Sequence, residues 1–353
     1  MSAPAMATRA ARALRGRAQL SDRLAVTADW IASHQRSDGA LPSFRRRRMD
    51  PWDHVQSAMA LAAMGRIDAA RAAYRYSGSS QHPNGAWPAA SNQHGVIDAT
   101  QESNHAAYLA TGLWHFYRVT GEVDLLAELW PALERAVGFV LQLQDDSGVI
   151  YWATDGDGIP WPAPLLAGCS SIYGSLGCAV RIAARLGQPR ERWQSARTKL
   201  GQALRQDQNR FVLAAVPEPP GRYAMDWYYP VLGGALRGEA GRRRLIDGHG
   251  EFIDEGTGCR CVRDRAWYTV AETCELVIAL ALSGLREQAQ ALFDWTASLR
   301  CEDGGYWMGI TYPNQLCWPP ERPSWTAATV ILAAHVLAAE PATSGLFESL
   351  ADL

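Results

Sequence analysis

Three features are scarce in this 353-residue sequence, and each scarcity excludes a class of protein. No stretch approaches 18 consecutive apolar residues, so we expect no helix that spans a membrane. The seven cysteines are odd in number and form no C-x-x-C pair, so neither a disulfide framework nor a structural zinc site is indicated. We therefore expect a cytoplasmic protein that uses no metal and no cofactor.

An excess of one charge is also lacking, because 34 basic residues face 36 acidic ones and leave a formal net charge of −2. Without a global field, binding to nucleic acid or to an anionic membrane surface is not expected. Only one basic residue is a lysine, Lys199, and this arginine bias predicts a GC-rich, actinobacterial genome. Tryptophan, in contrast, is abundant with 14 residues, which indicates a cavity or surface lined by aromatic rings.

Helical periodicity extends over almost the whole chain, whereas strand signals are scarce. From near Asp22 onward, apolar residues recur with the 3.6-residue spacing of an α-helix. The pattern predicts twelve helices, which pair into six hairpins. Their expected ranges are 21–35, 52–64, 66–79, 101–119, 124–144, 170–186, 189–210, 226–237, 239–248, 267–284, 286–300 and 322–339.

Two kinds of helix alternate in this series. The odd members, such as 124–144, have a face rich in Arg, Glu and Gln, as expected of a helix with one solvent-exposed side. The even members contain segments that are apolar nearly all round, such as 277–282 and 327–334, which predicts burial on most sides. An inner ring of six helices within an outer ring of six buries the even set. We therefore predict an all-α protein, an (α/α)6 toroid.

The predicted toroid occupies residues 20–342 as a single domain. Residues 1–19 contain four arginines and no acid, and they lack the apolar stretch of a secretion signal, so we interpret them as a flexible basic leader. Residues 343–353 are expected to form a C-terminal tail or a short helix.

A short phrase recurs after the outer helices and marks an internal repeat. Its four copies begin at Gln35, Gln81, Gln144 and Cys301, and each continues into a turn with Asp, Asn or Ser before Gly. Such a turn ends a helix, and the aromatic residue that follows in three copies covers the exposed helix end. All long connections then lie on one rim of the toroid, where sites usually form.

These features resemble the α/α-toroid superfamily in two of its branches. The Gln-x-x-Asp/Asn-Gly-x-Trp phrase is similar to the repeat of terpenoid cyclases and protein prenyltransferase β subunits. The six hairpins and the stretch 102–117, followed by Leu129-Trp130-Pro131, resemble the six-hairpin glycosidases of the glucoamylase and trehalase type and related sugar epimerases. The resemblance covers nearly the entire chain and implies the fold, whereas the reaction stays open because both branches share the scaffold.

Polar and aromatic residues gather at the starts of the even helices, whose N-termini are expected to meet at one cavity mouth. A carboxylate in a first turn can also act as a helix cap, and this alternative stays open for Asp53, Glu102 and Asp226. Glu272 lies more than a turn inside a predicted apolar helix, with Glu275 three residues on, so at least one of the two is desolvated or paired. The predicted substrate-binding residues are Trp52, Asp53, Glu102, Asn104, Tyr173, Trp227, Tyr228, Trp267, Trp307 and Trp325.

Aromatic rings around carboxylates suit carbohydrate chemistry, because Trp and Tyr faces stack on the C–H surfaces of sugars while carboxylates accept hydroxyl protons. Glycoside hydrolysis requires an acid with a raised pKa and a second carboxylate as base or nucleophile. We predict Asp226 and Glu272 as this catalytic pair, in either order, with Asp53 and Glu102 holding hydroxyls. The expected protein is a six-hairpin glycosidase-like hydrolase acting on a small sugar or a glycoconjugate.

Three alternatives to the hydrolase remain. A terpenoid cyclase or prenyltransferase would use the aromatic rings to stabilise carbocations, although the Asp-x-Asp-Asp acid and the zinc triad of those enzymes are missing. A sugar epimerase would use histidine to move protons, and His54, His94 and His105 fall near the rim. A toroid that binds a glycan or lipid without turnover needs only the aromatic residues.

A run of four arginines, Arg45–Arg48, precedes Trp52 and is expected beside the cavity mouth. Such a run is either a solvated loop or a clamp for a phosphate or carboxylate on the substrate. The clamp predicts an anionic sugar ligand. The sequence leaves the substrate, the stereochemistry and the oligomeric state open.

Overall fold

The computed structural model describes residues 19–44, 48–206, 208–211 and 221–352 of the chain. Three predicted segments lie partly outside these ranges. They are the leader (residues 1–18), the four-arginine run (residues 45–47) and the helix expected at 189–210 (residue 207). The division into leader, toroid and tail therefore stays a prediction.

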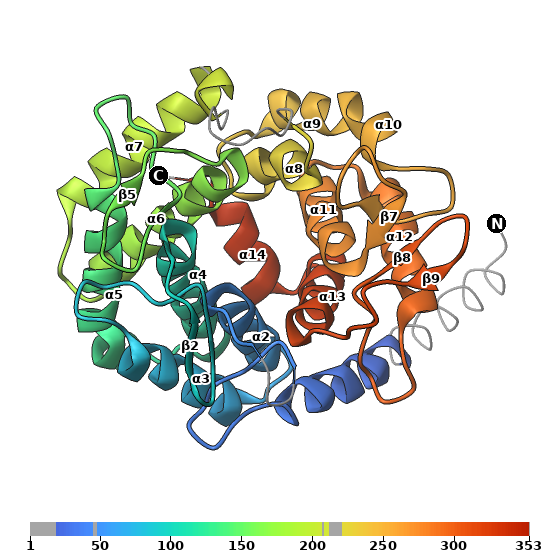
Figure 1. Cartoon of the computed structure of the whole chain (residues 1–353), viewed down its shortest axis with the longest axis horizontal. Helices are drawn as coiled ribbons and strands as arrows, with labels where there is room; N and C mark the ends of the chain where they lie inside the picture. Colours follow the sequence, from blue (N-terminus) through green and yellow to red (C-terminus); the bar gives the residue numbers. More distant parts are fainter. Residues whose placement is uncertain (1–18, 45–47, 207, 212–220, 353) are drawn as a thin grey trace, which may run out of the picture.

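Two concentric rings of helices form the molecule (Figure 1). Neighbouring inner helices pack against one another in chain order, and the last packs against the first, which closes the ring. The predicted (α/α)6 toroid is confirmed. The inner helices are α2 (Pro51–Ala63), α4 (Ser103–Thr120), α6 (Leu166–Arg185), α8 (Ala224–Leu232), α11 (Val270–Leu282) and α13 (Ser324–Leu337). The outer helices are 19–32, α3 (Ile67–Ser80), α5 (Asp124–Gln142), α7 (Glu191–Gln206), α9 (Gly238–Asp247) and α12 (Arg286–Trp295).

Burial follows the two helix types that the sequence distinguishes. In α11 every residue from Val270 to Leu280 is buried, and α13 buries twelve of its fourteen residues. The outer helix α9 buries only Gly241 and Leu245. Apolar area removed from water stabilises the fold by roughly 25 cal/mol per Å², so the inner ring provides the larger part of the hydrophobic stabilisation.

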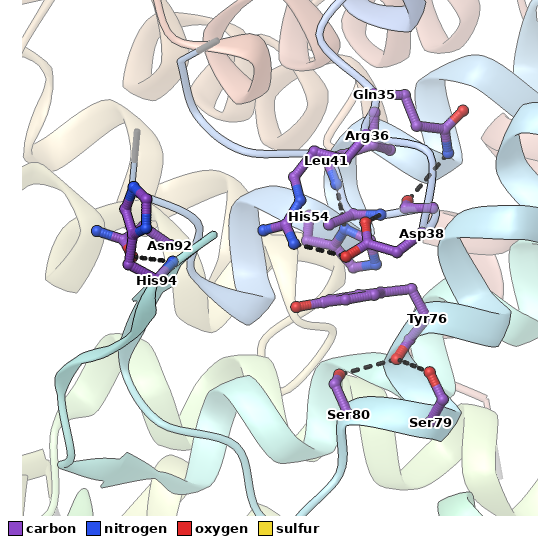
Figure 2. A network of polar contacts seen from close by, with 12 residues as sticks. Gln35, Arg36, Asp38, Leu41, His54, Tyr76, Ser79, Ser80, Asn92 and His94 are labelled. Carbon is purple, nitrogen blue, oxygen red and sulfur yellow. Dashed lines mark hydrogen bonds and ion pairs between the residues drawn. The ribbon is translucent and has the colours of Figure 1, made fainter. Parts of the chain in front are cut away.

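The repeated phrase builds the same hydrogen-bonded turn at successive hairpins, and Figure 2 shows the first of these turns, at Gln35. The Gln35 side-chain amide donates to the carbonyls of Gly39, 3.0 Å away, and of Ala69 in α3, 2.8 Å away. The other two glutamines repeat this pattern four residues on and in the next outer helix: Gln81 with Gly85 and Ala132 of α5, and Gln144 with Gly148 and Ala196 of α7. The repeat therefore joins neighbouring outer helices.

The glycines of the four turns all adopt a positive φ, between 89° and 96°, which favours glycine. A Cβ atom at any of them would collide with the backbone of the neighbouring outer helix. The fourth turn closes the outer ring, because Gly304 packs against Val26 of the helix at 19–32. The four contacts are Gly39 on Ala72, Gly85 on Arg135, Gly148 on Lys199 and Gly304 on Val26.

Short antiparallel strands, which the sequence did not predict, occur in the long connections. The helices expected to begin at residues 101 and 267 start later, because 101–102 and 267–269 are strands that pair with neighbouring loops. This pairing satisfies the backbone groups of the long loops. The strands are β1 (Ala90–Asn92), β2 (Gly95–Asp98), β3 (Gln101–Glu102), β4 (Ala153–Thr154), β5 (Pro160–Trp161), β6 (Cys259–Arg260), β7 (Trp267–Thr269), β8 (Gly309–Thr311) and β9 (Leu316–Cys317).

A further helix, α14 (Pro341–Ser349), packs against α4, α11 and α13 and lies within the ring in Figure 1. The inner helix α6 is long and apolar enough to cross a membrane, but 78% of its apolar window is buried inside the toroid. That degree of burial is typical of a core helix. Three short helical turns complete the description: α10 (His249–Phe252), η1 (Gln208–Phe211) and η2 (Thr296–Leu299).

Candidate active site

A cavity of about 320 Å³ opens where the inner helices α2, α4, α6, α8 and α13 begin, and we name it the polar cavity. Five of the predicted substrate-binding residues line it. The structure therefore brings together residues from distant parts of the chain at one mouth, as expected. The polar cavity is lined by Arg48, Asp50, Trp52, Asp53, Glu102, Asn104, His105, Leu165, Ala167, Gly168, Ser171, Met225, Tyr229 and Trp325.

Asp53, in the first turn of α2, is the most strongly perturbed acid of the polar cavity. Asp50 caps this helix by accepting the backbone N–H of Asp53 at 2.8 Å, and Pro51 occupies the first helical position. Burial raises the pKa of the Asp53 carboxyl well above its ordinary value, and the nearby charge of Asp50 raises it further. The Ser43 hydroxyl donates to Asp53 Oδ2 at 2.5 Å and opposes this shift. Asp53 therefore keeps its proton to a higher pH than a solvent-exposed aspartate.

Glu102 immediately precedes α4 and belongs to strand β3. Its Oε2 accepts a hydrogen bond from Trp152 Nε1 at 3.1 Å and lies 3.5 Å from His105 Nε2. Among the residues that the structure describes, none forms a hydrogen bond with the buried Nδ1 of His105. This corner of the cavity combines an acceptor with an imidazole and can hold sugar hydroxyls.

Aromatic rings form the remaining cavity walls. Trp52 stacks on Tyr108 with the ring centroids 3.7 Å apart and an interplanar angle of 14°. The Tyr229 ring lies 6.2 Å from that of Trp52, and Trp325 of α13 completes the wall. Because such faces pack on apolar C–H surfaces, the arrangement fits a ligand with both C–H faces and hydroxyls.

Glu272 of α11 lies near residues of two hollows and lines neither of them: the polar cavity and a second, larger hollow of about 580 Å³, which we name the aromatic groove. It is 8% exposed. Its carboxylate is hydrogen-bonded to Cys261, which lines the groove, and its charge acts on Tyr229, which lines the polar cavity. The aromatic groove is lined by Arg222, Tyr223, Cys261, Val262, Arg265, Ala266, Trp267, Thr311, Tyr312, Asn314, Leu316 and Trp318.

Glu275 lies one turn further along α11, in a small chamber beneath the polar cavity. Its carboxylate accepts the hydroxyls of Tyr228 at 2.6 Å and Tyr229 at 2.7 Å and the amide of Gln56 at 3.3 Å. Burial raises its pKa to about 7 even though these donors oppose the shift. The expectation that Glu272 or Glu275 is desolvated or paired is confirmed, most fully at Glu275.

Asp226, predicted as one of the catalytic pair, is directed to a different neighbour. Its Oδ1 accepts the backbone N–H of Ala167 at 3.2 Å, in the first turn of α6. Burial raises the pKa of Asp226, while this hydrogen bond and the charge of Arg244 act in the opposite direction. The side chain does not line the polar cavity. The helix-cap alternative that the sequence left open describes this geometry.

Several predicted aromatic residues lie outside the polar cavity. The rings of Tyr173 and Trp227 face outer helices, where Arg197 lies 4.1 Å from the Tyr173 ring and Trp227 Nε1 donates to the Arg244 carbonyl. Tyr228 is buried against Glu275, and Arg322 covers Trp307. Trp267 lines the aromatic groove from strand β7, so its predicted place in a helical first turn is wrong.

Two of the three histidines expected near the rim have other environments. His54 is buried, accepts the Leu41 N–H at Nδ1 and donates from Nε2 to the Ala73 carbonyl, as Figure 2 shows in part. Burial lowers its pKa to about 4, so it stays neutral and holds the first repeat turn in place. His94 is exposed beside strand β2. His105 alone lines the polar cavity.

Some lining residues gave no separate signal in the sequence. Ser171 and Tyr229 lie within motifs that the sequence indicated, but neither was named as a ligand contact. Met225, Leu165 and Gly168 are ordinary helix-start residues without recognisable chemistry. In the described parts of the chain, no three His, Cys, Asp or Glu side chains gather in a geometry that could hold a metal ion.

Comparison with known proteins identifies a relative and several similar folds. No family model matches the chain. An MMP endo-(1,4)-3-O-methyl-alpha-D-mannosidase from Mycolicibacterium hassiacum is 43% identical over 324 residues, which cover 92% of this chain and 88% of that protein. A glycosidase in complex with glucose superposes with a TM-score of 0.73 at 14% identity, covering 92% of this chain and 98% of the other. A sugar epimerase from a ruminal bacterium gives 0.66 at 10% identity, covering 89% and 96%.

Proposed function

Because this chain belongs to the family of the Mycolicibacterium endo-(1,4)-3-O-methyl-alpha-D-mannosidase, we propose that it hydrolyses internal (1,4) bonds in a chain of 3-O-methyl-α-D-mannose units. Membership in this family makes it a six-hairpin glycosidase-like enzyme, as the sequence predicted. The distant glycosidases and the epimerase share its fold and do not distinguish hydrolysis from epimerisation.

The observation that carries the proposed reaction is a buried carboxyl with a raised pKa in an aromatic-walled cavity. Asp53 lines the polar cavity, and its raised pKa favours the form that can donate a proton. Glycosidases need such a group beside the oxygen of the bond that breaks. We therefore assign the acid to Asp53, which the sequence had assigned to hydroxyl binding.

Glu272 is the second carboxylate of the proposal, in agreement with the sequence prediction. Its carboxylate acts on Cys261 of the aromatic groove and on Tyr229 of the polar cavity, and the proposal places it beside a sugar chain that extends from one hollow to the other. Asp226 is less suited to the chemistry because its carboxylate accepts the Ala167 N–H and its side chain does not line the polar cavity. By capping α6, the Asp226 side chain holds the start of that helix in position.

The proposed reaction is the hydrolysis of one glycosidic bond by one water molecule. Asp53 gives its proton to the glycosidic oxygen while the bond from that oxygen to the anomeric carbon breaks. Glu272 either removes a proton from the water that attacks this carbon or attacks it first as a nucleophile. Glu102 and Asn104 accept and donate hydrogen bonds to sugar hydroxyls, and Trp52 packs on the ring. Water enters as a reactant, and the product gains a reducing end.

The arginine clamp is a further part of the proposal. Arg48, the one described member of the four-arginine run, lines the polar cavity next to Asp53. A guanidinium at this point would bind an acidic substituent on the sugar. The expected result is that Arg48→Gln weakens inhibition by an anionic sugar, such as a mannose phosphate, and leaves neutral chains unaffected. Equal inhibition of the wild type and Arg48→Gln by the anionic sugar would contradict the arginine clamp.

Product analysis tests the proposed function. The wild type is incubated with α-(1,4)-linked 3-O-methyl-D-mannose chains, and the products are separated by length and checked for epimerised sugars. We expect fragments of several lengths from the start of the reaction, with Asp53→Asn and Glu272→Gln inactive and Asp226→Asn active. Release of single sugars only would contradict the endo mode. Epimerised sugars without cleavage, or no product, would contradict the hydrolase.

A further inference from the structure

The aromatic groove is a second hollow of the molecule, and none of the residues assigned to the cleavage lines it. We propose that the groove holds sugar units of the same oligosaccharide beyond those in the polar cavity. The inference rests on the proposed function, because it takes the ligand of the two sites to be one chain.

The floor of the groove is one face of the four-stranded sheet. Trp267 of β7 pairs with Thr311 of β8, and Thr311 pairs with Leu316 of β9, so the three side chains lie in one row. Directly opposed residues of antiparallel strands point to the same side. All three line the groove. The adjacent row, Tyr268, Ile310 and Cys317, lies against the core.

Large apolar side chains are exposed in this groove. Leu316 is 59% exposed, Trp318 51% and Tyr223 40%. A soluble protein exposes a gathered apolar patch mainly where it binds a ligand or partner. The volume of about 580 Å³ is within the range of sites that enclose small ligands.

The groove is held in shape by bonds among its own residues. Trp267 Nε1 donates to the Trp318 carbonyl at 2.7 Å, and the two rings meet at 76° with centroids 5.2 Å apart. The Trp318 N–H donates to the Gly309 carbonyl at 3.0 Å. A preorganised aromatic wall loses little conformational freedom when a ligand binds. Its rings present flat faces of the kind that stack on sugar rings.

The groove adjoins the polar cavity along two segments. Tyr223 lines the groove, while Met225, two residues further, lines the polar cavity. Cys261 of the groove is hydrogen-bonded to Glu272, and its carbonyl accepts the Ala224 N–H at 3.0 Å. These contacts bring the lining segments of the two hollows together, and the proposed chain runs from one hollow to the other beside Glu272. An enzyme that cuts inside a chain needs contacts on both sides of the broken bond, and the groove supplies one side.

Chain length provides the test. The kcat/KM of wild type and Trp318→Ala is measured on a long 3-O-methylmannose chain and on the shortest chain that the wild type cleaves. We expect about a tenfold loss on the long chain, mainly through KM, and no change on the short one, since one aromatic contact is removed. Leu316→Ala should give a smaller loss of the same kind. Equal effects on both lengths, or none, would overturn the proposal.

A matched control is Ile246→Ala, because Ile246 is 49% exposed on α9 and does not line the groove. It should leave both lengths unchanged. Calorimetric binding of the long chain to Asp53→Asn, with and without Trp318→Ala, separates the two proposals. Groove-dependent binding without cleavage by the wild type supports the groove and rejects the hydrolase. Cleavage without dependence on Trp318 or Leu316 rejects the groove alone.

Discussion

The starts of α2 and α8 have similar sequences and different positions relative to the site. Each combines an acid with a tryptophan, as Trp52-Asp53 and as Asp226-Trp227, and burial raises the pKa of both acids. In α2 both side chains line the polar cavity. In α8 neither does, and the next aromatic residue that lines it is Tyr229. Burial and a raised pKa therefore do not by themselves identify a catalytic acid.

The difference arises from helix phase. Successive residues of an α-helix are rotated by about 100°, so exchanging the order of acid and tryptophan turns each to another side. Asp226 faces the first turn of α6, and Trp227 faces α9 and α10, where it stacks on Phe252. Trp52 and Asp53 at the start of α2 therefore line the polar cavity, whereas Asp226 and Trp227 at the start of α8 pack against neighbouring helices.

The largest expected effect is a difference in kcat between the Asp53→Asn and Asp226→Asn variants. Asp53→Asn removes the proton donor and should lower kcat by about 10³-fold, within the range of general-acid catalysis. Asp226→Asn retains an oxygen that can accept the Ala167 N–H, so its kcat should stay within about threefold of wild type. Steady-state kinetics on a 3-O-methylmannose chain measures both. A greater loss in Asp226→Asn would reverse the assignment of the acid.

The two tryptophans should separate stability from substrate affinity. Trp227→Phe removes the hydrogen bond from Nε1 to the Arg244 carbonyl, which still accepts the Gly248 N–H, and should lower the free energy of unfolding by about 1 kcal/mol, with KM unchanged. Trp52→Phe shortens the cavity wall and should raise KM several-fold. Denaturant unfolding and kinetics on both variants provide the measurement. A raised KM in Trp227→Phe would show that α8 contacts the ligand through this ring.

Glu275, beneath the polar cavity, should make the free energy of unfolding depend on pH. The pKa of Glu275 is about 7 in the folded protein and close to 4.5 in an unfolded chain, so the folded state binds more protons between these values. Stability should therefore fall as pH rises from about 4.5 to 7 and level off above, by about 3 kcal/mol in total. Glu275→Gln should flatten this segment of the unfolding curve. An unchanged slope would assign the dependence to another group.

The smallest expected effects concern two neighbours that act oppositely on Asp53. Ser43 lowers its pKa by a hydrogen bond, and Asp50 raises it by charge. Only protonated Asp53 donates, so kcat/KM should fall at high pH. Ser43→Ala should move this fall to higher pH and Asp50→Asn to lower pH, each by under about one unit, since Asn still caps α2. Parallel shifts in both variants would exclude Asp53 as the titrating group.

Most of the fold could be predicted because its signals are local. Helical periodicity and the Gln-to-Gly turns repeat along the chain, and each turn docks on the next outer helix through contacts such as Gln81 with Ala132. The strands could not be predicted, since their pairing joins loops far apart, as between Trp267 and Thr311. A two- or three-residue strand carries no periodicity of its own.

The meeting of the inner-helix starts at one cavity could be predicted, but not the direction of each side chain. The sequence correctly indicated that the inner-helix starts meet, and Trp52, Asp53, Glu102, Asn104 and Trp325 do line one cavity. A shift of one residue separates the lining Tyr229 from the buried Tyr228. Boundaries inferred from periodicity are not accurate enough to fix such a phase.

A crystal structure of Asp53→Asn with a bound 3-O-methylmannose chain would test the central claim most directly. We expect a glycosidic oxygen within hydrogen-bonding distance of the residue-53 amide and sugar rings against Trp52, with the chain continuing past Glu272. A chain whose glycosidic oxygens all lie away from residue 53, or that places one beside Asp226, would contradict the proposed active site.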